Sequence, residues 1–367
     1  MTALIIIMDI TILIVAFSFA IIPYVTRRTE NFGVSIPENE YGNDDFRKMR
    51  RVFAVSSIAA GIFFSLAING LLSVYGENTV IISLAVLLET AVLFLIYYAL
   101  HRKMSAYKEN APWRDHISEQ IYVQLAEPPE ITKKPASPLW FAAYGLIIAV
   151  SIAVTLYAYP QLPDMIPIHF DLAGNADGYA VKSFWTVMFM PGILIFIALT
   201  FVLVYIIVIK SKRKIDAENP RESAARVSAF RAVWINFAVY SGLLLLASMA
   251  LLHVAMLGLF PVPIATYAIL GVCLAMIVWS VYLSFKYGQG GSRLDRGREK
   301  GRKLNAGDDD RHWIAGIIYN NKEDPALFVE KRFGVGFTVN IAKPVIWVAI
   351  AGILAACVWI IVLSISL

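Results

Sequence analysis

The sequence predicts an all-α polytopic membrane protein with about eight transmembrane helices and a small β-rich cytoplasmic module before the last helix. The first reason is composition: 58% of the 367 residues are hydrophobic and 16% are charged, which is more apolar than an average soluble domain. The second is the presence of eight apolar runs, each long enough to cross about 30 Å of hydrocarbon. The third is that lysine and arginine gather in alternate loops, as the positive-inside rule describes for multi-pass proteins.

The eight apolar runs are Leu4–Val25, Val52–Val74, Val80–Leu100, Trp140–Tyr159, Thr186–Ile209, Val233–Leu257, Ile264–Phe285 and Ile346–Ile365. We expect the first run to be a retained helix. A cleaved signal peptide is the alternative, but no lysine or arginine precedes this run, and no small-residue cleavage pattern follows it before Arg27 and Arg28.

The basic residues predict the orientation of the helices. Residues 26–51 hold six lysines and arginines, 101–139 six, 210–232 seven and 286–345 twelve, so that 31 of the 32 lie in alternate segments. The opposite set of loops holds only Lys182. Because short cytoplasmic loops carry the excess of positive charge, we expect these four segments in the cytoplasm and both termini outside.

The net charge of +5 also bears on partners. The basic residues adjoin the ends of apolar runs at almost every crossing, and the densest cluster lies between Arg293 and Lys303. Anionic lipid headgroups account for such charge, so we expect membrane lipids as partners and no nucleic acid.

The runs and the segments between them divide the chain into six parts. These are residues 1–100 with three helices, 101–139 as a cytoplasmic loop, 140–209 with helices four and five, 210–285 with a cytoplasmic connector and helices six and seven, 286–345 with a cytoplasmic linker and the β-rich module, and 346–367 with helix eight. Residues 101–139 contain five prolines, so we expect a short helix there followed by an extended linker.

Residues 286–345 open with Gly288, Gly290 and Gly291 among charged residues, which predicts a flexible linker with order from near Asp310. Aromatic and β-branched stretches then alternate with Asn, Asp, Pro and Gly, which predicts short strands and turns. The residues that mark this module are Trp313, Gly316, Tyr319, Asn321, Asp324, Pro325, Gly334 and Asn340.

The tripeptide Phe-Gly-Val occurs at 32–34 and again at 333–335, each time near an apolar run on the predicted cytoplasmic side. Glycine permits a tight backbone path. Our hypothesis is that the two pieces pack together, although a match of three residues also arises by chance.

The loop of residues 157–184 begins where the fourth run ends, on the predicted outer side. Pro160, Pro163 and Pro167 prevent a continued helix and favour an extended path. His169 and Asp171 are two residues apart and would share one side of a short strand. The segment Asn175-Ala-Asp177-Gly178 predicts a turn.

This loop resembles a known family. Leu162-Pro-Asp-Met-Ile-Pro-Ile-His-Phe170, then Gly174-Asn-Ala-Asp-Gly178 and Lys182, resemble the signature loop of bacterial membrane proteins with domain of unknown function 1648. That family is related to the SdpI-type immunity proteins, which protect a cell from a secreted toxin. Residues Trp313–Asn340 resemble a small domain of unassigned role that often follows it.

The resemblance implies a multi-pass protein of the bacterial cell membrane that acts in protection, immunity or signalling against a peptide or another envelope-active agent. A peptide or protein ligand is expected outside and a protein partner in the cytoplasm. The expected outer binding residues are Pro163, Asp164, Pro167, His169, Phe170, Asp171, Gly174, Asn175, Asp177, Gly178 and Lys182.

The same loop could hold a metal ion. His169 and Asp171, with Asp164 or Asp177, are plausible ligands, but the same side chains could instead hydrogen-bond the turns of the loop. A calcium EF-hand is excluded, because alignment on Gly178 leaves Phe184 where the bidentate carboxylate should stand. Whether a metal binds stays open, and no cofactor is expected.

Four polar residues within the apolar runs are further candidates: Asp9, Asn69, Glu89 and His253. An ionisable group in hydrocarbon is costly and usually faces the interior of the bundle or a cavity. They raise the alternative of a small-solute or proton-coupled transporter. A membrane scaffold is a third possibility. No phosphate-binding loop, paired-histidine zinc helix or nucleophile elbow is present, so we do not expect an enzyme.

Overall fold

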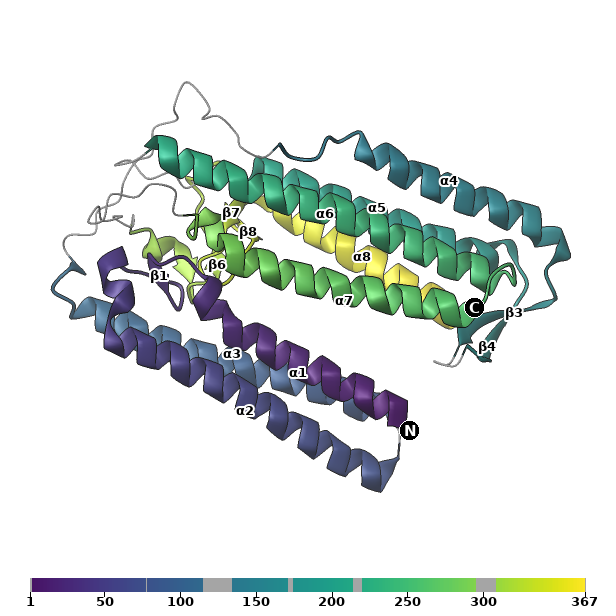
Figure 1. The fold of residues 1–367 in the computed structure, drawn as a ribbon, viewed down its shortest axis with the longest axis horizontal. Helices are drawn as coiled ribbons and strands as arrows, with labels where there is room; N and C mark the ends of the chain where they lie inside the picture. The colour runs from purple at the N-terminus through teal and green to yellow at the C-terminus, as the bar shows by residue number, and fades with distance from the viewer. Residues whose placement is uncertain are drawn as a thin grey trace. The chain divides into compact units, whose positions relative to one another are not determined.

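The protein is a multi-pass helical membrane protein. The computed structural model describes residues 2–76, 78–114, 134–170, 174–213, 220–294 and 308–366. Its helices are α1 (Thr2–Val25), α2 (Asp44–Tyr75), α3 (Thr79–Glu109), α4 (Trp140–Ala158), α5 (Phe184–Lys210), α6 (Pro220–Met256), α7 (Val262–Tyr287) and α8 (Pro344–Ser366). Seven of them are long and apolar enough to cross a membrane, and α8 adds a shorter apolar stretch, Pro344–Ala355, within the described residues. The predicted all-α fold is therefore confirmed (Figure 1).

The helices expose large apolar side chains along their length. On α2, Phe63 and Leu66 are 65% and 68% exposed, and on α3 Leu87 is 66% exposed. Contiguous apolar surface of this kind is rare on soluble monomers, whereas lipid tails cover it at no cost.

Several helices extend beyond the apolar runs. Helix α2 begins at Asp44, where the side chain of Asn43 accepts a hydrogen bond from the Asp45 amide at 3.0 Å, as an N-cap does. Helix α3 continues to Glu109, so the short helix expected after residue 100 is the end of α3. Most of the expected linker, residues 115–133, lies outside the described residues.

The chain divides into two compact units. The first contains residues 1–130, 212–227 and 284–342, and the second contains residues 131–211, 228–283 and 343–367. Helices α1, α2 and α3 of the first unit run side by side (Figure 1). Met8 and Ile12 of α1 pack there against Ile68 and Leu72 of α2.

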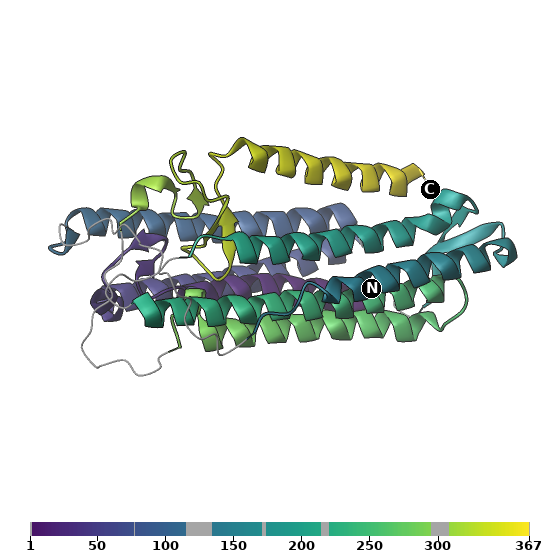
Figure 2. The same cartoon turned by 90° about the horizontal axis from the view of Figure 1, so that it is seen from above.

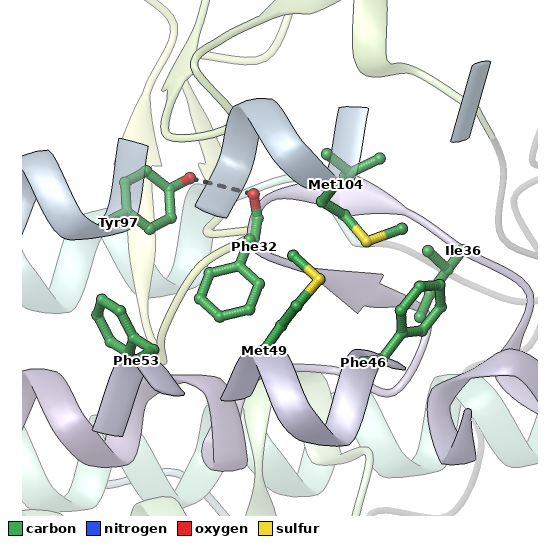
Figure 3. Packing of buried hydrophobic residues seen from close by; sticks show 8 residues of the cluster. Phe32, Ile36, Phe46, Met49, Phe53, Tyr97 and Met104 are labelled. Atoms are coloured by element: carbon green, nitrogen blue, oxygen red, sulfur yellow. Dashed lines mark hydrogen bonds between the residues drawn. The ribbon is translucent and has the colours of Figure 1, made fainter. Parts of the chain in front are cut away.

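A second core of the first unit lies where α1 leads into α2. The connection contains the strands β1 (Glu30–Asn31) and β2 (Val34–Ser35) and a 3₁₀ turn (Glu38–Gly42). Figure 3 shows Phe32 of this hairpin between Phe53 of α2 and Tyr97 of α3. The Tyr97 hydroxyl donates to the Phe32 carbonyl at 3.4 Å.

The expected β-rich module is present as two antiparallel hairpins, β5 (Trp313–Ile314) with β6 (Ile318–Tyr319) and β7 (Phe328–Glu330) with β8 (Phe337–Val339). A parallel bridge between Tyr319 and Asn340 joins them. We call residues 308–342 the C-terminal module.

The prediction of a flexible linker is wrong for its first residues, whereas residues 295–307 of the expected linker lie outside the described part of the chain. Residues Gln289–Gly291 form a buried 3₁₀ turn, and the Gln289 side chain is fully buried. Its amide nitrogen donates to the Gly336 carbonyl at 2.9 Å, and its oxygen accepts from the Gly336 amide at 2.8 Å. Gly288, Gly290 and Gly291 all have positive φ, so these glycines shape an ordered turn instead of a loose chain.

In the second unit, α4 packs against α5. Tyr144 of α4 lies in a core with Leu194 of α5 and Leu246 of α6, and its hydroxyl donates to the Val239 carbonyl at 2.7 Å. The strands β3 (Met165–Phe170) and β4 (Ala176–Val181) form a hairpin between α4 and α5, drawn in teal at the ends of these helices in Figure 2.

Candidate functional site

The β3–β4 hairpin contains most of the residues that the sequence marks for binding. After α4 a short 3₁₀ turn (Tyr159–Gln161) carries Pro160, and the chain becomes extended at Leu162. The strands then pair antiparallel, with Met165 opposite Val181, Ile166 opposite Ala180 and Pro167 opposite Tyr179. The expectation of an extended, proline-shaped loop is confirmed.

One face of the hairpin packs on its own unit. Ile166 and Ala180 are 4% and 2% exposed. Ile166 lies in a cluster with Ala158 of α4, Val187 of α5 and Leu257, just after α6. This contact fixes the hairpin to three helices.

The other face is apolar as well. Directly opposite residues of an antiparallel pair project from the same face, so Met165, Val181, Pro167 and Tyr179 share the face away from Ile166. Met165 is 50% exposed, Tyr179 55% and Val181 68%. An antiparallel hairpin with one packed face usually has a polar second face. The exposed apolar face is therefore not explained by folding.

Two polar side chains of the hairpin, His169 and Asp177, form a pair. His169 Nδ1 lies 2.5 Å from a carboxylate oxygen of Asp177, and both side chains are well exposed. Asp171, the other expected partner of His169, lies outside the described residues. The described residues contain no group of three side chains that could hold a metal ion.

The turn expected at Asn175–Gly178 is wrong. Strand β4 already begins at Ala176, so Asp177 and Gly178 lie in the strand, and Asn175 precedes it. A register shift around His169 brings Gly178 opposite that residue. A Cβ at Gly178 would lie 2.9 Å from the His169 Cβ, so this glycine allows the close crossing.

Other signature residues fix the base and the tip of the hairpin. Pro163 precedes β3, and the Lys182 amide donates to the Asp164 carbonyl at 2.7 Å. The Lys182 ammonium donates to the Leu162 carbonyl at 2.8 Å and lies 5.1 Å from the centre of the Tyr159 ring. At the tip, Phe170 pairs with Ala176, and Gly174, with φ of +85°, packs against Pro263.

The intramembrane polar residues are divided between the two units: Asp9, Asn69 and Glu89 belong to the first and His253 to the second. In the first unit, Asp9 accepts hydrogen bonds from Ser65 Oγ at 2.6 Å and from Asn69 Nδ2 at 3.1 Å. Glu89 of α3 is fully buried. Neither carboxylate oxygen of Glu89 has a hydrogen-bond partner among the described residues.

His253 belongs to the second unit, where it is 2% exposed. The Thr155 hydroxyl donates to the Ser151 carbonyl at 2.7 Å, and His253 Nε2 lies 2.7 Å from the same hydroxyl oxygen. Because the Thr155 proton is already used, His253 Nε2 must carry the donor hydrogen. The contact between His253 and Thr155 connects α6 to α4, one helical turn before Leu257 in the sequence.

In the first unit, sequence reasoning missed Arg332 as a candidate, although its buried side chain joins three segments of the chain. It is 1% exposed and forms ion pairs with Asp309 and Asp310. It also donates to the Gly33 carbonyl at 3.0 Å and to Ser35 Oγ at 3.1 Å. Gly33 and Ser35 lie 299 and 297 positions away from Arg332, a contact that no local sequence signal could indicate.

These contacts confirm that the two Phe-Gly-Val segments pack together. The rings of Phe32 and Phe333 stack with centroids 5.9 Å apart. Gly33 and Gly316 approach so closely that a Cβ at Gly33 would lie 2.7 Å from the Gly316 Cα. Gly334, with φ of +93°, donates its amide to Thr26 Oγ1 at 2.9 Å.

Charge stabilises this contact. Burial by itself would raise the pKa of Asp310, but the charges of Arg332 and Lys108 and their hydrogen bonds hold it below the usual value. Burial opposes the charge of Arg332, yet Asp309, Asp310 and Glu30 raise its pKa above its already high value. Asp310 and Arg332 are therefore both charged at neutral pH.

The remaining module residues hold its two hairpins together. Trp313 and Tyr319 pack with centroids 5.0 Å apart. The Tyr319 hydroxyl donates to Asp324 at 2.8 Å, and Lys212 donates to the same carboxylate at 2.7 Å. Burial would raise the pKa of Asp324, but Lys212, the Ala326 amide and Tyr319 bring it below the usual value.

Asn340 links the ends of the second hairpin to the segment before it. Its side-chain nitrogen donates to the Asn321 carbonyl at 2.7 Å, and its oxygen accepts from the Asn321 amide at 3.0 Å. Pro325, between these anchors, is exposed. The eight module residues expected from sequence thus act mainly in folding the module.

Two family models match parts of the chain. Residues 146–195 match the family described as Domain of unknown function (DUF1648), and residues 322–347 match the Family of unknown function (DUF5808). No curated protein and no solved structure matches the chain. The first match runs from α4 through the hairpin into α5, and the second contains β7, Arg332 and β8. The chain is therefore a multi-pass membrane protein that carries a DUF1648 domain built around the β3–β4 hairpin and a DUF5808 segment built around Arg332.

Proposed function

We propose that the protein protects a bacterial cell against a peptide or another envelope-active agent, which it meets with the β3–β4 hairpin. The observation that carries this proposal is the exposed apolar face formed by Met165, Pro167, Tyr179 and Val181. The hairpin is firmly held through its other face, so this surface is presented on a fixed support, as a binding surface should be.

The charge distribution supports an outer location for the hairpin. Of the 32 lysines and arginines, 31 lie in the segments predicted to be cytoplasmic, and only Lys182 lies on the hairpin side. With that orientation both termini are outside, and an agent arriving at the bacterial membrane from outside meets the hairpin first.

The position of the hairpin supports an amphipathic agent. Directly after the hairpin, Phe184 and Trp185 at the start of α5 are 49% and 65% exposed, and exposed aromatic residues at helix ends are typical of the membrane interface. An apolar surface at that depth fits a peptide that lies in the interface with its apolar side buried. The resemblance to SdpI-type immunity proteins points in the same direction.

The C-terminal module supports a signalling role on the predicted cytoplasmic side of the membrane. It is attached to the first three helices through Arg332 and Phe333. A partner recruited there would give the protein a signalling branch.

Two alternatives have different requirements. A small-solute or proton-coupled transporter would depend on Asp9, Asn69, Glu89 and His253, and a membrane scaffold would need only its protein partners. Neither requires the exposed hairpin face.

The test is survival of a deletion strain that is challenged with envelope-active peptides and complemented with variants. Tyr179→Ser combined with Val181→Ser should remove protection while the protein still reaches the membrane in normal amount. Tyr75→Ser is the matched control, because Tyr75 is 68% exposed at a helix end but outside the hairpin, and it should protect like the unaltered protein. Full protection by the hairpin double variant would refute the proposal.

A further inference from the structure

Glu89 is the most isolated ionisable side chain in the membrane-spanning part of the first unit. It lies about three turns into α3 and its exposed fraction is 0%. Neither of its carboxylate oxygens has a hydrogen-bond partner among the described residues. Buried polar groups without partners are rare in native proteins and call for an explanation.

Small residues on the two neighbouring helices make room for this carboxyl group. A Cβ at Gly61 of α2 would lie 3.5 Å from Glu89 Oε1 and 2.5 Å from the Cβ of Ala16 on α1. Gly61 therefore lets α1 approach α2 and leaves space for the carboxyl group at the same level. Ser57, one turn before Gly61 on the same face of α2, is also fully buried, and its hydroxyl has no described partner.

No described charge compensates Glu89. The ionisable side chains of α1 are Asp9 and Tyr24, seven and eight residues from Ala16 or about 10 and 12 Å along the helix. On α2 the first is Arg51, ten residues from Gly61 or about 15 Å away, and on α3 it is Tyr97, eight residues or about 12 Å away. Asp9 is already bonded to Ser65 and Asn69.

The atoms available around Glu89 indicate which ligand the site can bind. A metal cation needs several oxygen ligands, and the described residues contain no group of three His, Cys, Asp or Glu side chains that could hold one. Burying an unpaired carboxylate costs far more than burying the neutral acid. A proton needs one oxygen atom and no further ligands.

We infer that Glu89 is a proton-binding site, which keeps its proton at neutral pH while α1, α2 and α3 are packed and releases it when they part. Proton release and helix separation are then linked. The parted state binds fewer protons than the packed state, so raising the pH favours separation. This inference concerns the first unit and does not depend on the protective role of the hairpin.

Infrared difference spectroscopy in lipid vesicles at neutral pH tests the inference. The spectrum of the unaltered protein minus that of Glu89→Gln should contain the carbonyl band of a protonated carboxylic acid, and this band should shift in D₂O. The matched control is Asp9→Asn, because three donor contacts hold the Asp9 carboxyl group. The carbonyl band that Glu89→Gln removes should remain in the spectrum of this control.

A carboxylate band for Glu89 in the neutral-pH difference spectrum would overturn the inference. If Glu89→Gln does not fold, reaction of the unaltered protein with a hydrophobic carbodiimide replaces it, because this reagent adds across protonated carboxyl groups to give a stable N-acylurea. Peptide mass spectrometry should then find the adduct on Glu89, at a yield that falls as the pH rises. An adduct yield that does not change with pH, or no adduct, would count against a bound proton.

Discussion

Replacing Arg332 by methionine tests whether the buried arginine attaches the C-terminal module to the first three helices. The change keeps an apolar stem of similar length but removes two ion pairs and the hydrogen bonds to Gly33 and Ser35. Breaking a buried ion pair on one side costs about 3–5 kcal/mol. Two features reduce this figure here.

The carboxylates left behind are not fully buried. The side chains of Asp309 and Asp310 are 30% and 29% exposed, so water can partly solvate them. Asp310 also keeps Lys108 at 2.7 Å. We therefore expect a loss of about 2–4 kcal/mol, which corresponds to an opening equilibrium about 30- to 700-fold larger.

Hydrogen exchange read by mass spectrometry measures this opening. The relevant amides are those of the second module hairpin, such as Lys331, bonded to the Gly336 carbonyl, and Asn340, bonded to the Leu327 carbonyl. They should exchange faster by that factor in Arg332→Met, while amides in α5 should be unchanged. The control is Lys331→Met, whose side chain is exposed, with an expected change below about 0.5 kcal/mol. Equal exchange in the two variants would refute the role of Arg332.

Three further predictions concern single positions. Gly33→Ala should lower the free energy of unfolding by more than about 1 kcal/mol, because φ is +76° and the new Cβ would lie 2.7 Å from Gly316; thermal unfolding in detergent measures this, and Gly70→Ala, with open space around it, should be neutral or slightly stabilising. The ionised Asp324 contributes to the stability of the module above about pH 4, and this contribution is lost as the pH falls toward the lowered pKa. Asp324→Asn should remove it. Acidification should therefore increase the opening of the module, read from amide exchange, less in the variant than in the unaltered protein. Ile166→Ala should weaken the attachment of the hairpin by about 2 kcal/mol or more, which limited proteolysis between β3 and β4 would detect; unchanged cleavage would contradict the packing described for Ile166.

Sequence alone was sufficient for the helices. Each of the eight apolar runs lies in one helix, to within one residue at its end, because a segment that crosses hydrocarbon must satisfy its own backbone hydrogen bonds. The sequence predicted the helix ends less well, since α3 continues to Glu109, nine residues beyond its apolar run. Outside the apolar region, helix extent depends on caps and tertiary contacts more than on hydropathy.

The glycines were the hardest residues to interpret. Gly288, Gly290 and Gly291 are as typical of a flexible linker as of a tight turn, and only the two hydrogen bonds between Gln289 and Gly336 decide for the turn. Gly178 was placed in a turn because it follows Asp177, but it lies in β4 opposite His169. In both cases a partner distant in the chain determined the backbone conformation.

By itself the sequence determined the number and course of the helices, the extended proline-shaped path after α4 and the β-rich module, because hydropathy and backbone restrictions act within about twenty residues. The tertiary structure decided which surfaces remain available. It buried Ile166 and left Tyr179 exposed, it paired Asp9 but gave Glu89 no described partner, and it brought Arg332 to Gly33. These outcomes depend on contacts between distant segments, whose geometry no local pattern encodes.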